Sequence, residues 1–430
     1  MALYVKPGAS GTGASANDPI SFGNANCVGA SSLWTPTNPL VVMQGSSGES
    51  FEINKTGTGG GALVQTIIRA GTTGSRTERL RMFGANASGE PLARGQYAEF
   101  KAVTGGGAYT ASESMLSIGT DTASSAPISH VLVRAIKFNG NQVSYNAINN
   151  GSILNNSNVT AQQASAFFVW EDCWFEGARH NGCSMYGGLA GSENQASHIF
   201  IRCRFTNCGN TDATGRAVMA RQSLPASWVF IDCEFSGNAG GPRTVGATQM
   251  PMVMKSCVSH NNLLDTPGCQ FVNGCVQIDG CTFYGNRLGG IAVSAIDHEL
   301  SDITNNIIAG NGGTTSVFGG IFDGTYETGV TIRSAYSNNC FHNNVYGASL
   351  TPSNASLSFM TEHRVNDVPG TGHVYADPGF ASTISGSEDL RSLVQALRTG
   401  GIANLPGLGG NRSIGTPWCG RSYRPRTRGL

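Results

Sequence analysis

Residues 230–238 read Phe-Ile-Asp-Cys-Glu-Phe-Ser-Gly-Asn, and the same pattern returns at 278–286 as Ile-Asp-Gly-Cys-Thr-Phe-Tyr-Gly-Asn. The cysteine of this unit occurs five times, at steps of 30, 30, 24 and 24 residues. An internal repeat of this period indicates a solenoid, in which each repeat buries its apolar face only against its neighbours. The repeated residues are Cys173, Cys203, Cys233, Cys257 and Cys281, with Phe175, Phe205, Phe235 and Phe283 two positions further on.

The spacing inside the unit predicts a short strand that ends in a turn. A cysteine and a phenylalanine two residues apart lie on the same face of a strand. Glycine and asparagine then tolerate the backbone conformation of a tight turn. Stacking the units at ~4.8 Å places each cysteine, phenylalanine and asparagine over its counterpart. The repeat therefore predicts an all-β fold, a single-stranded right-handed parallel β-helix with ladders of these three residue types inside.

These motifs resemble the right-handed parallel β-helix superfamily that includes pectate-lyase-like proteins and phage tailspikes. Residues 4–13 and 17–19 are similar to the usual start of such domains. Residues 376–380, followed by 389–391, are similar to their usual last coil. The resemblance covers most of the chain and implies the fold. It implies no single function, because this fold hosts lyases, hydrolases, adhesins and structural parts.

The chain divides into three expected regions. Residues 1–120 are Gly-rich and less regular, and we interpret them as an N-terminal cap with irregular early coils. Residues 121–385 form the regular β-helix, and residues 386–430 form a C-terminal cap with an arginine-rich tail. Within that cap, residues 387–400 have leucines at helical spacing between a serine and a glycine, which predicts a short helix. The arginines of the tail either face solvent or dock on an acidic neighbour.

Composition argues against several classes of protein. The formal net charge is zero, which argues against a nucleic-acid surface. No apolar run approaches the length of a membrane span, and the first residues lack the pattern of a Sec signal peptide. The eight histidines are scattered, and no pair of CxxC motifs occurs. We therefore expect no metal, no cofactor, no membrane partner and no nucleic-acid partner.

The cysteines divide into two groups. In stacked coils the Cβ–Cβ distance stays near ~4.8 Å, whereas a disulfide needs about 3.5–4.5 Å. The ladder cysteines are therefore expected to be reduced and to fill the core. Cys27 and Cys419 lie outside the regular coils. They are either free thiols or intermolecular disulfides to neighbouring subunits in an oxidising environment.

Charged and aromatic residues flank the ladder cysteines at positions that we expect to face outward. Those positions hold Asp172, Arg202, Asp232, Trp174, Arg204 and Glu234. One interpretation is a carbohydrate groove with three catalytic acids, in which Trp174 and Arg204 contact sugar. The other is a surface salt-bridge ladder, with Arg204 between the Trp174 ring and the Glu234 carboxylate. A catalytic acid needs a raised pKa, and neighbouring arginines lower it.

Three functions follow from the resemblance and from these residues. The leading hypothesis is a non-enzymatic structural component of a phage virion, such as a capsid decoration, a collar or a tail-associated part. It would be made in the host cytoplasm and would assemble as a homotrimer with other virion proteins. The first alternative is a tailspike polysaccharide depolymerase, a lyase or glycoside hydrolase, using Asp172, Asp232 and Glu234. The second is an adhesin that binds a bacterial surface glycan through Trp174.

Overall fold

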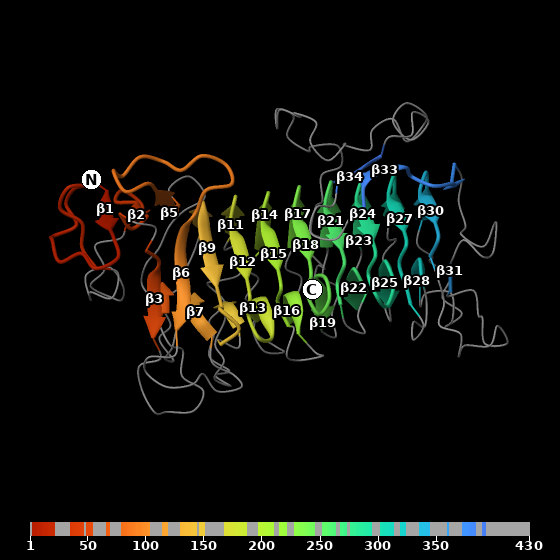
Figure 1. Cartoon of the computed structure of the whole chain (residues 1–430), viewed down its shortest axis with the longest axis horizontal. Helices are drawn as coiled ribbons and strands as arrows, with labels where there is room; N and C mark the ends of the chain where they lie inside the picture. Colours follow the sequence, from red (N-terminus) through yellow and green to blue (C-terminus); the bar gives the residue numbers. More distant parts are fainter. Residues whose placement is uncertain are drawn as a thin grey trace, which may run out of the picture.

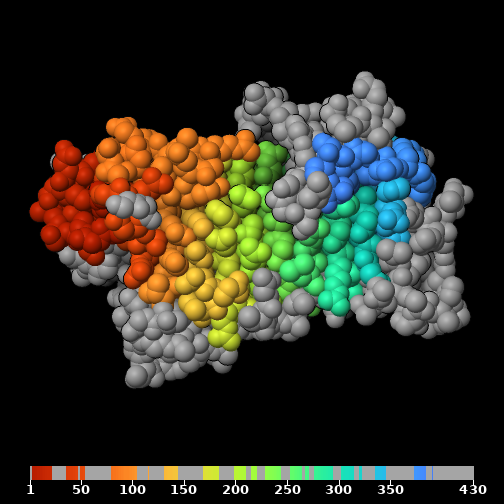
Figure 2. Space-filling view, viewed as in Figure 1, coloured from red at the N-terminus to blue at the C-terminus, as the bar shows by residue number. Residues whose placement is uncertain are grey.

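The fold is described from a computed structural model. It describes residues 2–21, 35–46, 49–54, 66–68, 79–103, 114–118, 130–143, 146–150, 167–186, 197–209, 215–221, 228–245, 252–263, 267–272, 276–294, 302–313, 319–323, 335–344, 359–360, 372–383 and 389–392. In these residues the protein contains strands and no helix. The described coils follow one another along the long axis of the molecule (Figures 1 and 2).

Three long sheets make up the three sides of the coil. The first sheet contains β1 (Leu3–Val5), β2 (Leu40–Met43), β5 (Leu80–Ala85), β8 (Val131–Arg134), β11 (Phe167–Glu171), β14 (Ser197–Ile201), β17 (Trp228–Ile231), β20 (Met252–Lys255), β23 (Val276–Asp279), β26 (Asp302–Thr304) and β29 (Ala335–Ser337). The second contains β3 (Phe51–Asn54), β6 (Ala98–Val103), β9 (Ile136–Asn139), β12 (Trp174–Glu176), β15 (Arg204–Thr206), β18 (Glu234–Ser236), β21 (Val258–His260), β24 (Thr282–Tyr284), β27 (Ile307–Ala309), β30 (Cys340–His342) and β32 (Val374–Tyr375).

The third sheet contains β4 (Thr66–Ile68), β7 (Ser114–Ile118), β10 (Asn146–Asn150), β13 (Asn181–Tyr186), β16 (Arg216–Arg221), β19 (Arg243–Val245), β22 (Cys269–Val272), β25 (Ile291–Ser294), β28 (Ile321–Asp323) and β31 (Phe359–Met360). In the regular coils each strand pairs in parallel with the strand three places later, as β11 does with β14. The described exceptions to parallel pairing are β28 with β31 and a hairpin of β33 (Phe380–Ser382) and β34 (Asp389–Ser392). This topology confirms the parallel β-helix.

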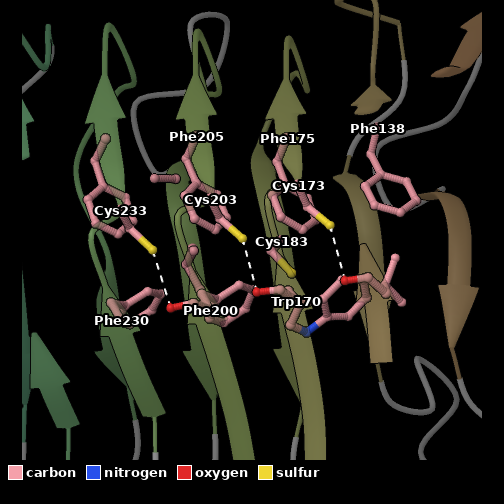
Figure 3. Close-up of a cluster of buried hydrophobic side chains, with 14 of the residues drawn as sticks. Phe138, Trp170, Cys173, Phe175, Cys183, Phe200, Cys203, Phe205, Phe230 and Cys233 are labelled. Atoms are coloured by element: carbon pink, nitrogen blue, oxygen red, sulfur yellow. Dashed lines mark hydrogen bonds between the residues drawn. The ribbon is translucent and has the colours of Figure 1, made fainter. Parts of the chain in front are cut away.

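The cysteine ladder lies in the core, at the point where each coil enters the second sheet. The Cys203 thiol donates to the Trp170 carbonyl at 3.3 Å, and the Cys233 thiol donates to the Phe200 carbonyl at 3.4 Å (Figure 3). Each bond runs from one coil to the coil before it. All five ladder cysteines are buried, and none of them is in a disulfide in the structure.

Asparagine takes over the same position in later coils. Asn306 donates through its amide nitrogen to the Ile278 carbonyl at 3.1 Å, as the thiols do in earlier coils. Its amide oxygen also accepts the backbone N–H of Cys281 at 2.9 Å. Asparagine therefore provides a donor and a strong acceptor at a position where cysteine provides mainly a weak donor.

The residue before each ladder position turns the chain from the first sheet into the second. In these turns φ lies between 49° and 63°, in the left-handed region that L-residues rarely adopt. The turn residues are Ala135, Asp172, Arg202, Asp232, Ser256, Gly280, Asn305 and Asn338. Asp172 and Asp232 are therefore turn residues at the border of two sheets. The sequence interpretation, which placed them beside a strand on its outward face, was wrong in this respect.

A second ladder of asparagines follows the second sheet, as the repeat predicts. The Asn286 amide nitrogen donates to the Ser259 carbonyl at 2.9 Å and to the Asn311 amide oxygen at 2.9 Å. Its amide oxygen accepts from the Asn262 side chain at 2.7 Å. The side chains are fully or almost fully buried. The members of this ladder are Asn238, Asn262, Asn286, Asn311 and Asn344.

Aromatic rings fill the space between the ladders. Phe175 and Phe205 are stacked with centroids 4.7 Å apart, and Phe205 and Phe235 are 5.1 Å apart. Rings from the first sheet meet this column edge-on, as Phe200 meets Phe205 at 5.5 Å (Figure 3). The core therefore repeats one aromatic arrangement from coil to coil.

The C-terminal part of the chain corrects one prediction. Asp389–Ser392, inside the helix predicted for 387–400, forms strand β34 and pairs with β33. Nearby, Phe380 packs edge-on against Tyr284 at 5.2 Å, and an apolar cluster joins it to the outward face of the second sheet. Figure 2 shows this segment in blue on the last coils. The rest of 387–400, the tail arginines, Cys27 and Cys419 lie outside the described residues.

The ladder cysteines should resist alkylation in the native protein. Burial removes their access to reagent, and it raises the pKa of the Cys203 and Cys281 thiols well above the usual range. We expect iodoacetamide to label none of the five in buffer and all five in guanidinium chloride. Peptide mass spectrometry measures this, and labelling of the ladder in the native protein would contradict the buried arrangement.

Replacing Asn286 with alanine should strongly destabilise the fold. The Ser259 carbonyl and the Asn262 amide lose their partners in the dry core, which costs roughly 2–4 kcal/mol in total. The matched control is Glu52→Ala at an exposed position of β3, which should change stability by less than ~0.5 kcal/mol. Urea denaturation compares the variants, and equal midpoints would show that the ladder contributes little.

Candidate functional site

The candidate residues gather on the outward side of the second sheet. Lys137, Trp174, Arg204 and Glu234 lie in register on β9, β12, β15 and β18, one per coil. Glu176 and His260 lie on neighbouring outward positions of the same sheet. Because the inner side chains of these strands fill the aromatic core, only the residues between them face outward. We call Lys137, Trp174, Glu176, Arg204, Glu234 and His260 the polar face.

Trp174 is enclosed by its neighbours on the polar face. The Lys137 ammonium lies 4.1 Å from the centroid of the ring, and the Arg204 guanidinium lies 4.9 Å from it. These cations come from the coils before and after, so they occupy the two faces of the ring. The indole N–H donates to the Thr206 hydroxyl at 2.7 Å, and the Tyr97 ring lies at 5.6 Å. Neither ring face is left open for a sugar.

Glu234 is held by three neighbours. Arg204 Nε donates to one carboxylate oxygen at 3.0 Å, the Ser236 hydroxyl donates to the other at 3.1 Å, and His260 Nε2 lies at 3.5 Å. Burial alone would raise the pKa of Glu234, but the hydrogen bond from His260 and the charge of Arg204 outweigh it. Together they hold that pKa at about 2. Glu234 is therefore an ionised carboxylate at any ordinary pH.

Asp172 belongs to a separate charge cluster in the turns. Arg202 donates from Nε and Nη2 to its two carboxylate oxygens at 2.7 and 2.9 Å. Arg202 also bonds Glu171, and Arg134 lies 4.0 Å from Asp172. Such a two-point pair is geometrically rigid. The hydrogen bonds and charges of these acids raise the pKa of Arg202 further, so the guanidinium stays charged.

Asp232 lies two turns beyond Asp172 and differs from the other two acids. Its side chain is at the surface, yet the protein packed around the carboxyl raises its pKa. The positive charges of Arg202 and Arg94 lower the pKa of Asp232, but they act less strongly than burial does. The pKa of Asp232 is therefore shifted toward the protonated form, opposite to the shift of Glu234.

The structure therefore brings together part of the predicted set. Arg204 does lie between the Trp174 ring and the Glu234 carboxylate, as the salt-bridge interpretation predicts. Asp172 and Asp232 lie in the row of turns at the border of the sheet. Sequence reasoning missed Lys137 and His260, although aligning the coils on their phenylalanine column would have placed both on this face.

The polar face is a closed network of charges. Besides the pairs above, Lys137 bonds Glu176 at 2.7 Å and Glu99 at 3.2 Å. Within the described ranges, no three histidines, cysteines or acids gather closely enough to hold a metal ion. Among the same residues no helix has the length and apolar character of a membrane span. The network suits a stable surface more than a reacting centre.

The fold is similar to that of a known enzyme. The crystal structure of pectate lyase Pel9A matches with a TM-score of 0.58, over 89% of this chain and 83% of that chain. The chain has a pectate-lyase-like β-helix fold. Sequence identity is 13%, so the similarity concerns the fold alone. No protein-family model matches the chain, and a search of curated proteins finds no match.

The ion pair of Glu234 should make stability depend on pH. Its folded pKa of about 2 lies below the value near 4.3 of a free glutamate, so ionised Glu234 stabilises the fold. That contribution is complete above about pH 5 and is lost as the pH falls toward 2. We expect Glu234→Gln to lower the free energy of unfolding by roughly 2 kcal/mol at neutral pH, and by much less near pH 2.

Denaturant titrations at several pH values measure this difference. The control is Glu90→Gln in an exposed loop, which should give the same pH profile as the native protein. If the free energy of unfolding depended on pH in the same way in the native protein and in Glu234→Gln across the acid range, the assigned ion pair would be contradicted.

Proposed function

We propose that this chain is a non-enzymatic structural β-helix that forms part of a larger assembly. The observation that supports this best is that Glu234, Trp174 and Arg204 of the polar face, and Asp172 in the neighbouring turn, are already engaged by other side chains. A general acid needs a pKa near the working pH, whereas the pKa of Glu234 is about 2. Asp172 is held by two hydrogen bonds from Arg202. These groups have no free capacity for proton transfer.

The interior supports the same proposal. Thiol and amide side chains bond one coil to the next in two ladders, and phenylalanine rings stack from coil to coil through Phe175, Phe205 and Phe235. Bending or slipping one coil would break several of these contacts at once. Such a body keeps its length and shape under load, which suits a scaffold or spacer.

A phage virion is the assembly that we propose for this scaffold, with a capsid decoration, a collar or a tail-associated part as the role. The support is the likeness of the sequence motifs to those of phage tailspikes. Mass spectrometry of purified particles tests it, because a structural component is present in a fixed copy number per particle. Detection only in the soluble lysate would contradict the virion role.

A polysaccharide depolymerase is the second candidate. The pectate-lyase-like fold and the raised pKa of Asp232 favour it. An acid that is protonated more readily than its neighbours is the group that would protonate a leaving oxygen. This candidate would use Asp232 and not Glu234 as the proton donor.

Incubation with polygalacturonate, bacterial capsular polysaccharide and lipopolysaccharide separates the two candidates. We expect no new reducing ends and no unsaturated products above the level of a boiled sample. Product formation that Asp232→Asn abolishes would overturn the structural proposal. Asp377→Asn is the matched control. Asp377 is exposed and lies away from the polar face, and the side-chain oxygen of an asparagine there can still accept the hydrogen bond from the Gly379 backbone N–H.

A further inference from the structure

The outward side of the first sheet carries an apolar stripe. On the described strands its residues lie in two columns, one residue per coil in each column, and neighbours are in register. The stripe runs through five consecutive strands, β8, β11, β14, β17 and β20, which lie side by side (Figure 1). We define the apolar stripe as Leu132, Val169, Ile199, Val229 and Val253 of the first column with Ile201 and Ile231 of the second.

The stripe contrasts with the second sheet of the same coils. There the outward positions hold residues such as Trp174, Arg204, Glu234 and Ser236. A sheet face in contact with water is expected to be polar, and a face covered by another layer is expected to be apolar. In the part of the chain that the structure describes, no strand is packed as a layer on this side of the first sheet. All stripe residues except Val169 remain partly exposed.

Charged residues border the stripe at both of its ends. Arg81 and Arg134 lie on β5 and β8, before the stripe. Asp279 and Asp302 lie on β23 and β26, after it. The Arg134 side chain is 49% exposed, and Asp302 is exposed. In the second column Glu171 follows Arg134 and Lys255 precedes Asp279, so the apolar middle has a charged residue of each sign on either side.

Such a face is complementary to a second copy of itself in one orientation. A two-fold axis parallel to the strands, placed between β14 and β17, reverses the order of the coils and sets each column against itself. Six apolar residues of the stripe then meet one another, as Ile199 meets Val229, whereas Leu132 meets Gln277. Every charge meets its opposite across the axis: Arg81 with Asp302, Arg134 with Asp279, and Glu171 with Lys255.

The parallel orientation does not have this property. A two-fold axis along the rod would set the second column against the first column of the same coil. Arg134 would then face Leu132, and Lys255 would face Val253, so charges would be buried against apolar groups. That arrangement carries a desolvation cost without a compensating partner. Only the antiparallel arrangement satisfies both the stripe and its borders.

We propose that this face is the interface of an antiparallel two-fold dimer of the chain. Eight strands at ~4.8 Å and about 15 Å of strand length give a contact on the order of 1,000 Å² over the two copies. That is the lower limit of a specific interface. The ion pairs lie toward its ends, where solvent screens them, so they set orientation while the stripe supplies affinity.

Light scattering of the full chain after size exclusion tests the dimer. The expected mass is about twice 44.8 kDa at micromolar concentration. Ile199→Lys should raise the dissociation constant at least ~100-fold, because it buries a charge in the middle of the stripe. Leu263→Lys, at an exposed leucine that follows β21 and lies outside the first sheet, is the matched control and should leave the mass unchanged. Thermal unfolding checks that both variants fold.

Charge reversal tests the orientation. Arg134→Asp and Asp279→Arg should each weaken the dimer, and the double variant should restore it, since the two positions meet across the two-fold axis. A monomeric native protein, a threefold mass, or a dimer unaffected by Ile199→Lys would overturn the proposal. Loss of the dimer in the double variant would overturn the antiparallel orientation.

Discussion

Each coil must turn sharply between the first and second sheets, and that turn makes the strongest demand on the sequence. One residue takes the left-handed conformation, and in most of the described coils the next side chain bonds a carbonyl of the coil before. Cysteine meets this demand in the early coils and asparagine in the later ones. A thiol is a weak donor and small enough to lie among aromatic rings, whereas an amide adds an acceptor for the next coil's backbone. Coil stacking, core filling and register all depend on this position.

Because the ladders hold the register, outward side chains also stand in columns one coil apart. That spacing lets a lysine and an arginine enclose the Trp174 ring from its two sides, and lets Arg204 reach Glu234. The polar face is therefore a product of the same repetition that builds the core. Its charges compensate one another, as Glu234 lies beside Arg204 and Lys137 lies between Glu99 and Glu176.

Sequence reasoning predicted the coil, the ladders and the reduced thiols because a repeated spacing of two residues has one structural solution. It misplaced Asp172 and Asp232, since strand alternation does not reveal where a strand breaks at a left-handed residue. It also predicted a helix across Asp389–Ser392, which pairs with β33 instead. There the leucine spacing indicates only a local helical preference, and backbone pairing with the preceding strand outweighs it.

The sequence by itself determined the architecture, because each repeat carries its own strand, turn and ladder residues. Only the tertiary structure decided which charges meet, because contacts between coils join residues some 30 positions apart whose rotamers no local pattern specifies. The pKa of Glu234, the enclosure of Trp174 and the apolar stripe bordered by opposite charges all arise from that stacking. The physical reason is that electrostatics and burial depend on neighbours in space, and the chain acquires those neighbours only when its coils close on one another.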